Sequence, residues 1–328
     1  MGRFIKISAT LTAALVMLLG SFAGIASVAA QDEEKPTITV GSKDFTESII
    51  LAEMVALLLE DNGFEVERQL NLGGTAVVHQ ALVNDEIDIY VEYTGTGLLA
   101  ILGMELPGSG GTPAATPAGG AGAGATPAAA AGTGEVYQIV KSEYAEQFNL
   151  AWLQPWGFQN TYALAVTAET AEEYDLQSVS DLEGVAGELT FGATQEFLVR
   201  PDGLPGLEAA YGIEFGDAKG LDPGLTYSAV DSGDVDVISA FSTDGRIPAL
   251  DLVVLEDDKS YFPPYYAAPV VRQDLLEQAP EVEEILNQLA GTIDSDTMAD
   301  LNFQVDDGGV EPVDVARGYL VEQGLIEG

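Results

Sequence analysis

Residues 88–99 read DIYVEYTGTGLL, a strand pattern followed directly by a glycine-rich turn. Alternation along a strand places Ile89, Val91 and Tyr93 on one face. The segment therefore predicts a β-strand that ends in a tyrosine, next to the hydroxyls and backbone amides of the turn. Such groups suit a nucleotide, a carboxylate or an organic cation, and the remainder of the chain decides among these three.

A later segment repeats this design. Residues 81–97 read ALVNDEIDIYVEYTGTG and residues 228–245 read SAVDSGDVDVISAFSTDG, so that each strand ends in an aromatic residue, Tyr93 or Phe241. Strand and helix patterns alternate along the chain, which predicts an α/β fold with a mostly parallel sheet and helices on both faces. The repeat predicts two lobes, and ligands of such sheets bind at the carboxyl ends of the strands.

Composition excludes several classes of function. The 328 residues include 12 Lys+Arg and 53 Asp+Glu, a net charge of −41, so nucleic acid and anionic membranes are poor partners and a solvated acidic surface suited to high salt is expected. The absence of cysteine excludes disulfides, thiolate metal sites and a lipid-modified N-terminal cysteine. With His79 as the only histidine, neither a zinc site nor a Ser-His-Asp triad is expected.

Residues 1–30 have the layout of a secretory signal peptide. Arg3 and Lys6 precede an uncharged apolar run, which ends at Val28, Ala29 and Ala30 before the acidic QDEEKP. We expect cleavage near Ala30 and a location in the periplasm or at the outer face of the cytoplasmic membrane. An uncleaved membrane anchor is the alternative, because the apolar run is long enough to span a bilayer.

Residues 107–134 form a low-complexity segment in which 23 of 28 residues are Gly, Ala or Pro. A segment without core-forming side chains predicts a surface loop or linker. The flanking GTGLLAILGMEL and EVYQIVKSEYAEQF both have helical patterns, which favours an insertion within one α/β layer over a link between domains.

Motifs for nucleotide binding and hydrolysis are weak. GTGLLA matches the dinucleotide pattern Gly-x-Gly-x-x-Ala, but the acidic residue expected about 20 positions later would fall in the uncharged low-complexity segment. The chain has no Walker-type phosphate loop and no Gly-x-Ser-x-Gly elbow.

Aromatic and basic residues at turn-like positions favour a binding protein. Tyr93, Tyr162 and Tyr265 offer ring faces that attract a quaternary ammonium, a cation that has no N–H to donate. Lys43 and Arg200 stand at comparable turns and can pair with a ligand carboxylate. The amides and hydroxyls of TGTG add donors for an anion.

Several motifs in fixed order strengthen this interpretation. They are ITVGSKDFTESIILAEM, NLGGTAVVHQAL, IDIYVEYTGTGL, WGFQNTYALAV, VRPDGLPGLEAAYGIEF, AFSTDGRI, LEDDKSYFPPYYAAPVV and IDSDTMADLNFQVD. Together they resemble the osmoprotectant-binding proteins of ABC importers, which bind glycine betaine, proline betaine, choline or carnitine. The resemblance covers about residues 37–325, interrupted only by the low-complexity segment.

The resemblance implies a two-lobed clamshell, the type II periplasmic-binding-protein fold with two crossover strands. Residues 37–160 and 266–328 would form lobe one, which contains the 107–134 loop, and residues 161–265 would form lobe two. The segments NTYALAV and YYAAPVV would cross between the lobes.

The resemblance also implies a ligand site. By position, the family's aromatic cage corresponds to Tyr93, Tyr162, Phe241 and Tyr265, its carboxylate-binding residues to Lys43, Thr96 and Arg200, and a backbone carbonyl near the methylammonium to Asn160. Phe241 stands where the family usually has Tyr, so the ring face is kept and the hydroxyl is lost. Lys43, where some relatives have Gln, suggests a ligand with a carboxylate.

We therefore expect a non-enzymatic receptor that needs no cofactor or metal and delivers a quaternary amine to an ABC permease in the membrane. Glycine betaine or proline betaine is the first choice of ligand. Choline, carnitine and another small solute, such as an amino acid or a polyamine, remain alternatives, and a secreted enzyme is the alternative from a different class.

Overall fold

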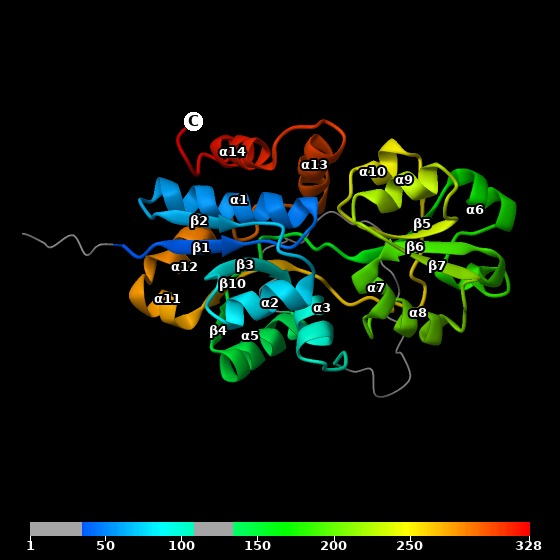
Figure 1. Ribbon diagram of the computed structural model, residues 1–328, viewed down its shortest axis with the longest axis horizontal. Helices are drawn as coiled ribbons and strands as arrows, with labels where there is room; N and C mark the ends of the chain where they lie inside the picture. Colours follow the sequence, from blue (N-terminus) through cyan, green and yellow to red (C-terminus); the bar gives the residue numbers. More distant parts are fainter. Residues whose placement is uncertain (1–34, 108–133) are drawn as a thin grey trace, which may run out of the picture. The chain divides into compact units, whose positions relative to one another are not determined.

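The computed structural model describes residues 35–107 and 134–328, which form one compact unit containing two five-stranded sheets (Figure 1). The predicted signal peptide, and all of the 107–134 loop except its two end residues, lie outside the described residues. In the first sheet the order is β2 (Val66–Gln69), β1 (Ile38–Gly41), β3 (Ile89–Tyr93), β10 (Ala267–Arg272) and β4 (Leu150–Trp152). In the second sheet the order is β7 (Asp217–Leu221), β6 (Thr190–Thr194), β8 (Val237–Phe241), β5 (Tyr162–Val166) and β9 (Val253–Leu255).

Helices cover both faces of each sheet, as the alternating pattern predicted. Those that accompany the first sheet are α1 (Thr46–Asp61), α2 (Thr75–Val83), α3 (Thr94–Thr96), the π-helical turn η1 (Gly97–Ile101), α5 (Glu135–Phe148), α11 (Gln273–Gln278), α12 (Glu281–Leu286), η4 (Asn287–Leu289), α13 (Ser295–Asp306) and α14 (Pro312–Glu322). Those of the second sheet are α6 (Ala168–Tyr174), η2 (Val179–Leu182), η3 (Ala186–Glu188), α7 (Gln195–Val199), α8 (Leu204–Tyr211), α9 (Leu225–Asp231) and α10 (Arg246–Ala249).

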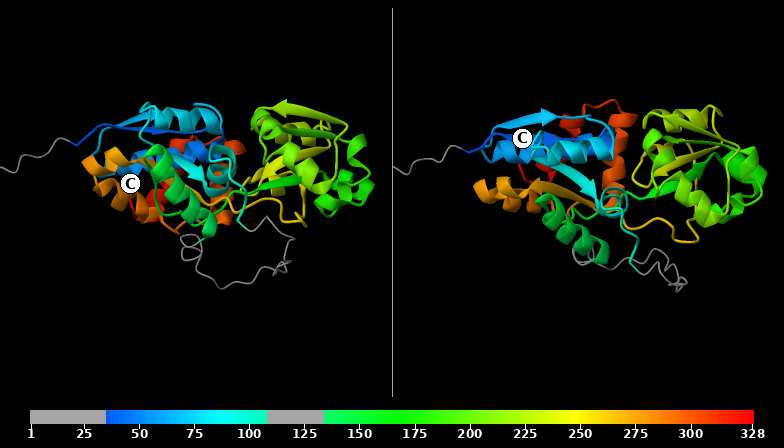
Figure 2. Two further views of the ribbon diagram at one scale, coloured as in Figure 1. Left: turned by 90° about the horizontal axis from the view of Figure 1, so that it is seen from below. Right: turned by 60° about the horizontal axis from the view of Figure 1, so that its bottom comes forward.

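Both faces of β3 are buried, one against α1 and the other against α2 and α5. Ile89 and Val91 pack with α1 in the largest apolar cluster. This cluster also includes residues of α12, α13 and α14, which contact α1 and lie beside it in Figure 2. Tyr90 on the opposite face packs with Val78 of α2 and Val140 of α5 in a second cluster. Because both faces are covered, the strand is apolar throughout, apart from Glu92.

One expectation is refined and another was wrong in detail. Four strands of each sheet run in the same direction, as predicted, but both sheets are mixed, because β10 runs antiparallel to β3 and β4, and β5 runs antiparallel to β8 and β9. The chain enters each of these strands directly from the other sheet, without the helical crossover that parallel neighbours require. The helix expected over GTGLLAILGMEL is only the short α3 and η1, and Gly103 follows with a φ of +63° that ends helical geometry.

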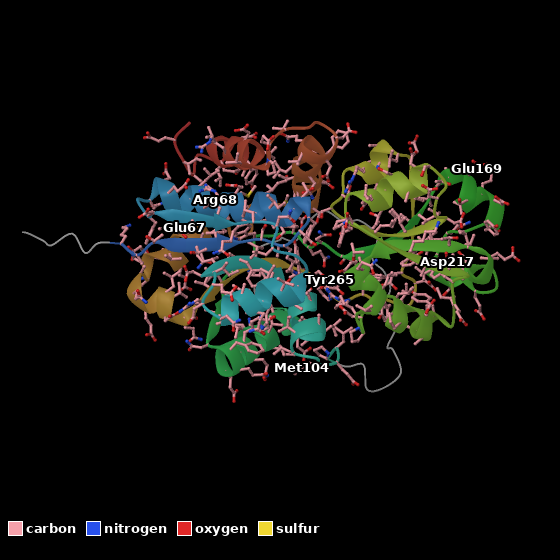
Figure 3. All side chains as sticks on the ribbon, in the orientation of Figure 1. Glu67, Arg68, Met104, Glu169, Asp217 and Tyr265 are labelled. Carbon is pink, nitrogen blue, oxygen red and sulfur yellow. The ribbon has the colours of Figure 1, made fainter. Side chains whose placement is uncertain are left out.

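Acidic side chains are spread over the surface of the protein, on elements that belong to both sheets. Glu67, Glu169 and Asp217 are exposed, whereas Tyr265, labelled in the same view, is buried (Figure 3). This distribution agrees with the expectation of a solvated acidic surface.

His79 belongs to the core of the first sheet. Its ring lies in α2 with 8% exposure, edge-on to Tyr144 (5.4 Å between centroids) and Phe148 (4.8 Å) of α5. Its Nδ1 has no hydrogen-bond partner among the described residues. Burial, with a smaller contribution from Lys43, lowers the pKa of His79 to about 4. The only histidine of the chain is therefore a neutral core residue.

This burial predicts a loss of stability in mild acid. Between pH 6.5 and 4 the unfolded chain protonates His79 and the folded chain does not, so the free energy of unfolding falls as pH falls. Denaturant titrations at pH 7, 5.5 and 4.5 give the free energy of unfolding, which should fall more for the wild type than for His79→Phe as the pH is lowered. The extra loss in the wild type should be on the order of 1–2 kcal/mol after allowance for solvent screening. Parallel pH profiles for the two proteins would contradict it.

Candidate functional site

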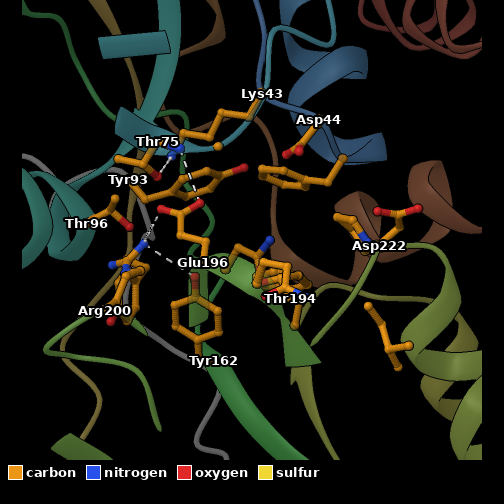
Figure 4. Close-up of a pocket in the computed structure, with 18 residues that line it drawn as sticks. Lys43, Asp44, Thr75, Tyr93, Thr96, Tyr162, Thr194, Glu196, Arg200 and Asp222 are labelled. Atoms are coloured by element: carbon orange, nitrogen blue, oxygen red, sulfur yellow. Dashed lines mark hydrogen bonds and ion pairs between the residues drawn. The ribbon is translucent and has the colours of Figure 1, made fainter. Parts of the chain in front are cut away.

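One pocket of about 270 Å³ contains all eight side chains proposed from the sequence (Figure 4). They reach it from the ends of strands in both sheets, from the short helical segments that follow β3 and β6, and from the two links between the sheets. The residues are Lys43, Tyr93, Thr96, Asn160, Tyr162, Arg200, Phe241 and Tyr265. That they contact a ligand stays a prediction, while their convergence on one cavity is a property of the fold.

Aromatic rings form a continuous series around this pocket. The ring of Tyr162 lies 5.2 Å from that of Phe241 and 5.6 Å from that of Tyr265, the latter at right angles. Phe45 stacks on Phe241 at 5.6 Å and lies 6.2 Å from Tyr93, so it joins the rings of the two sheets. Phe45 was missed from the sequence, although an aromatic residue two positions after Lys43 in GSKDF was a usable signal.

The tyrosine hydroxyls are held by polar neighbours. Tyr93 donates to Glu47 Oε1 (2.6 Å), and Tyr265 donates to Asp202 (3.4 Å). Burial raises the pKa of Tyr93 and of Tyr265 well above the usual value, and nearby carboxylates add to the rise. The rings are therefore neutral at physiological pH and present π faces, not phenolates.

The glycines of TGTG make room for aromatic rings. A Cβ on Gly95 would lie 2.7 Å from the ring of Tyr265, and one on Gly97 would lie 2.8 Å from the ring of Trp152. The turn therefore has glycines because rings pack directly on its backbone, and Thr96 between them is buried at the pocket wall. This packing accounts for the resemblance to a dinucleotide fingerprint.

Lys43 follows β1 and is buried beside the strand that carries Tyr93. Its Nζ donates to Glu92 Oε1 (2.6 Å) and to Thr75 Oγ1 (3.0 Å), and it lies 5.4 Å from the centre of the Tyr93 ring. Glu92 is fully buried, and its Oε1 also accepts from the Tyr93 amide (2.7 Å). The acidic residue on the opposite face of β3 from Tyr93 is thus the counterion of Lys43.

Arg200 follows α7 and is also buried. Its Nε and Nη2 bind the carboxylate of Asp202 as a fork, while Nη1 donates to Glu196 Oε1 (3.2 Å) and to Tyr162 Oη (3.4 Å). Burial alone would lower the pKa of Arg200, but Tyr162 and the two carboxylates raise it above the usual value. The guanidinium is a permanent charge directed into the pocket.

Asn160 occupies the link from β4 to β5. Its Nδ2 donates to Glu47 Oε1 (2.9 Å), and its backbone N–H donates to the carbonyl of Tyr265 (3.0 Å). Its Oδ1 has no partner among the described residues. Asn160 therefore ties together the two links that connect the sheets.

Glu47 was not proposed from the sequence. Its carboxylate links several side chains that lie behind the aromatic rings. Its carboxylate accepts hydrogen bonds from Tyr93, Asn160, Thr243 (2.5 Å) and Asn302 (3.0 Å). Burial raises the pKa of Glu47, and the four donors oppose that rise. Thr243 follows β8 of the second sheet, so this one side chain of α1 joins both sheets behind the rings.

Three acidic residues of the pocket wall were also missed. Asp44, Glu196 and Asp222 line the cavity, and Glu196 lies between Arg200 and Thr75 (Figure 4). In a chain this acidic, no single Asp or Glu stood out in the sequence. The spacing of four between Glu196 and Arg200 was the one usable signal, because such a spacing suits a helical ion pair.

Two structural features are absent from residues 35–107 and 134–328. There, no three His, Asp or Glu side chains are grouped so that they could hold a metal ion. Among the same residues, no helix combines the length and apolar character needed to cross a membrane.

Comparison with known proteins agrees with this geometry. A family model described as the substrate binding domain of ABC-type glycine betaine transport system matches residues 36–322. The chain is 35% identical to the carnitine transport binding protein OpuCC of Listeria monocytogenes, over 90% of this chain and 89% of that one. It is 34% identical to the glycine-betaine-binding protein of Pseudomonas aeruginosa, over 89% of each chain.

The fold is also that of a solved relative. A crystal structure of a glycine betaine/carnitine/choline ABC transporter matches with a TM-score of 0.66 and 33% identity, covering 88% of this chain and all of that one. These matches confirm the two-lobed α/β fold and exclude the secreted-enzyme alternative. The chain belongs to the family of substrate-binding domains of ABC-type glycine betaine transport systems, and it is a non-enzymatic substrate-binding protein of an osmoprotectant importer.

Proposed function

We propose that this protein captures glycine betaine or proline betaine outside the cytoplasm, in the periplasm or at the outer face of the cytoplasmic membrane, and delivers it to an ABC permease. The observation that carries the proposal is the convergence of four cage rings and two buried cations on one pocket of about 270 Å³. A ligand with a quaternary ammonium at one end and a carboxylate at the other fits that combination.

Tyr93, Tyr162, Phe241 and Tyr265 hold the trimethylammonium group. A quaternary nitrogen cannot donate hydrogen bonds, so ring faces are the natural contact, and each contributes on the order of 0.5–2 kcal/mol. The separations of 5.2 and 5.6 Å between neighbouring rings support this role. Asn160 supplies a carbonyl beside the methyl groups.

Lys43, Thr96 and Arg200 hold the carboxylate. The Nη1 atom of Arg200 faces Tyr162, which brings the guanidinium next to the cage. The guanidinium carbon lies 5.6 Å from the Tyr162 ring centre, so the positive charge of Arg200 is adjacent to the cage. Micromolar binding, about −8 kcal/mol overall, is within reach of three or four rings and one ion pair after closing costs.

Two lobes close on the ligand in this proposal. Residues 37–160 with 266–328 form lobe one and residues 161–265 form lobe two. The division of strands supports these boundaries, because β1 to β4 and β10 share one sheet and β5 to β9 share the other. The cage then takes Tyr93 from lobe one and Phe241 from lobe two.

Choline is the second candidate. Asp44, Glu196 and Asp222 line the same pocket, and their negative charge favours a ligand with a net positive charge. Carnitine is the ligand in the name of a relative at 35% identity. The relative affinities for betaine and choline decide between the first and the second candidate.

Isothermal calorimetry with glycine betaine, proline betaine, carnitine and choline tests the assignment. We expect heat with a dissociation constant in the micromolar range for at least one betaine, and weaker binding of choline. If none of the four ligands gives heat with protein that is folded by circular dichroism, the proposed function is wrong.

Substitutions of Phe241 distinguish the contribution of the ring face to binding from the effect of a hydroxyl. Phe241→Tyr keeps the π face and should bind betaine within a few-fold of the wild type, whereas Phe241→Ala should lose about 10-fold or more. Titration of both variants with the same betaine gives the comparison. Wild-type affinity in Phe241→Ala would mean that the pocket does not use this ring, and an equal loss in the Tyr and Ala variants would mean that the pocket has a different shape from the one proposed.

A variant at Arg200 distinguishes contacts to the ligand's carboxylate from contacts to its ammonium group. Because removing Arg200 alone would leave Asp202 buried without its partner, the variant combines Arg200→Gln with Asp202→Asn. Betaine binding should weaken about 100-fold, since the positive charge of Arg200 and its Nη1 donor are lost, while choline binding should change less than about 10-fold. Matching losses for the two ligands would show that Arg200 is structural and does not contact a carboxylate.

A further inference from the structure

Glu196 lies inside the pocket between its two cationic regions. Oε2 accepts from the backbone N–H of Thr75 (3.2 Å) at the start of α2, and Oε1 accepts from Arg200 Nη1 (3.2 Å) (Figure 4). One carboxylate thus joins residues that accompany the two different sheets. These donors are of the kind that a ligand carboxylate uses.

The neighbouring backbone leaves room for this contact. A Cβ on Gly74 would lie 2.6 Å from Glu196 Oε2, so a side chain at this position would push the carboxylate away from Thr75. On the other side, Thr194 caps α7 by accepting from the Phe197 amide (3.2 Å), which places Glu196 in the first turn of that helix. The close approach of Glu196 to α2 therefore depends on glycine at position 74.

The charges around the pocket do not balance. Lys43 has Glu92 as its counterion and Arg200 has Asp202, and all four of these side chains are nearly fully buried. Each cation is thus neutralised before Glu196 is counted, and Glu196 is an additional negative charge. Burial would raise the pKa of Glu196, but Lys43 and Arg200 lower it below the usual value, so Glu196 is ionised at neutral pH.

We propose that Glu196 is the residue that sets the selectivity of this pocket between zwitterionic and purely cationic quaternary amines. The inference rests on the proposed function, because it assumes that the pocket binds such amines. Its negative charge repels a ligand carboxylate that seeks Arg200 and the Thr75 amide, and it attracts the net positive charge of choline. A zwitterion feels both effects, which partly cancel, whereas choline feels only the attraction.

Neutralising Glu196 therefore shifts the preference toward betaine. The measured quantity is the ratio of the dissociation constant of choline to that of glycine betaine. In Glu196→Gln, which keeps the size and an acceptor oxygen, this ratio should rise about tenfold. Glu196→Asp keeps the charge and should stay within about threefold of the wild-type ratio. Glu183→Gln, an exposed residue after η2, removes the same charge elsewhere and should leave the ratio unchanged.

Calorimetric titration of the full chain and the three variants, each checked for folding by circular dichroism, separates the outcomes. A higher ratio in Glu196→Gln alone supports the inference. If the wild type binds the ligands and Glu196→Gln leaves the ratio unchanged, or if Glu183→Gln raises it equally, the inference is wrong and the proposed function stands. If the wild type binds neither glycine betaine nor choline, the inference is wrong, and if proline betaine and carnitine also give no heat, the proposed function is wrong as well.

Discussion

Contact between aromatic rings across the carboxyl ends of two sheets is the interaction on which the pocket depends. Phe45 is the joining element, because it stacks on Phe241 from the second sheet and approaches Tyr93 from the first. Tyr162, the first residue of β5, and Tyr265, in the link from β9 to β10, continue the ring series. Since these rings belong to elements far apart in the chain, the site exists only when both sheets are folded and in contact.

Buried charge is the second constraint on the site. Lys43 and Arg200 would be costly to bury alone, and they are compensated by Glu92 on the adjacent strand β3 and by Asp202 two residues along the chain. Glu47 receives four hydrogen bonds behind the rings, which offsets part of its desolvation. The pocket therefore combines π faces with fixed charges whose partners are supplied in advance, an arrangement that lowers the reorganisation needed when a small charged ligand binds.

Much of this could be predicted from local sequence. Apolar strand patterns gave the strands, and the aromatic residues that end them, Tyr93 and Phe241, lie at the pocket because strand ends converge there. The antiparallel entry of β5 and β10 could not be predicted from alternation, since it depends on the chain crossing between sheets. Glu196 and Glu47 were missed for a related reason: their partners Thr75 and Thr243 are 121 and 196 positions away, and no local pattern marks such a contact in so acidic a chain.

The central claim is that rings hold a positive charge, not merely a hydrophobic shape. The most direct measurement compares glycine betaine with 3,3-dimethylbutanoate, which replaces the quaternary nitrogen by carbon and keeps the methyl groups and the carboxylate. Competition calorimetry should show that the carbon analogue binds at least about 100-fold more weakly, because the cation–π attraction of several rings is lost. Binding of the two compounds with equal affinity would contradict the account.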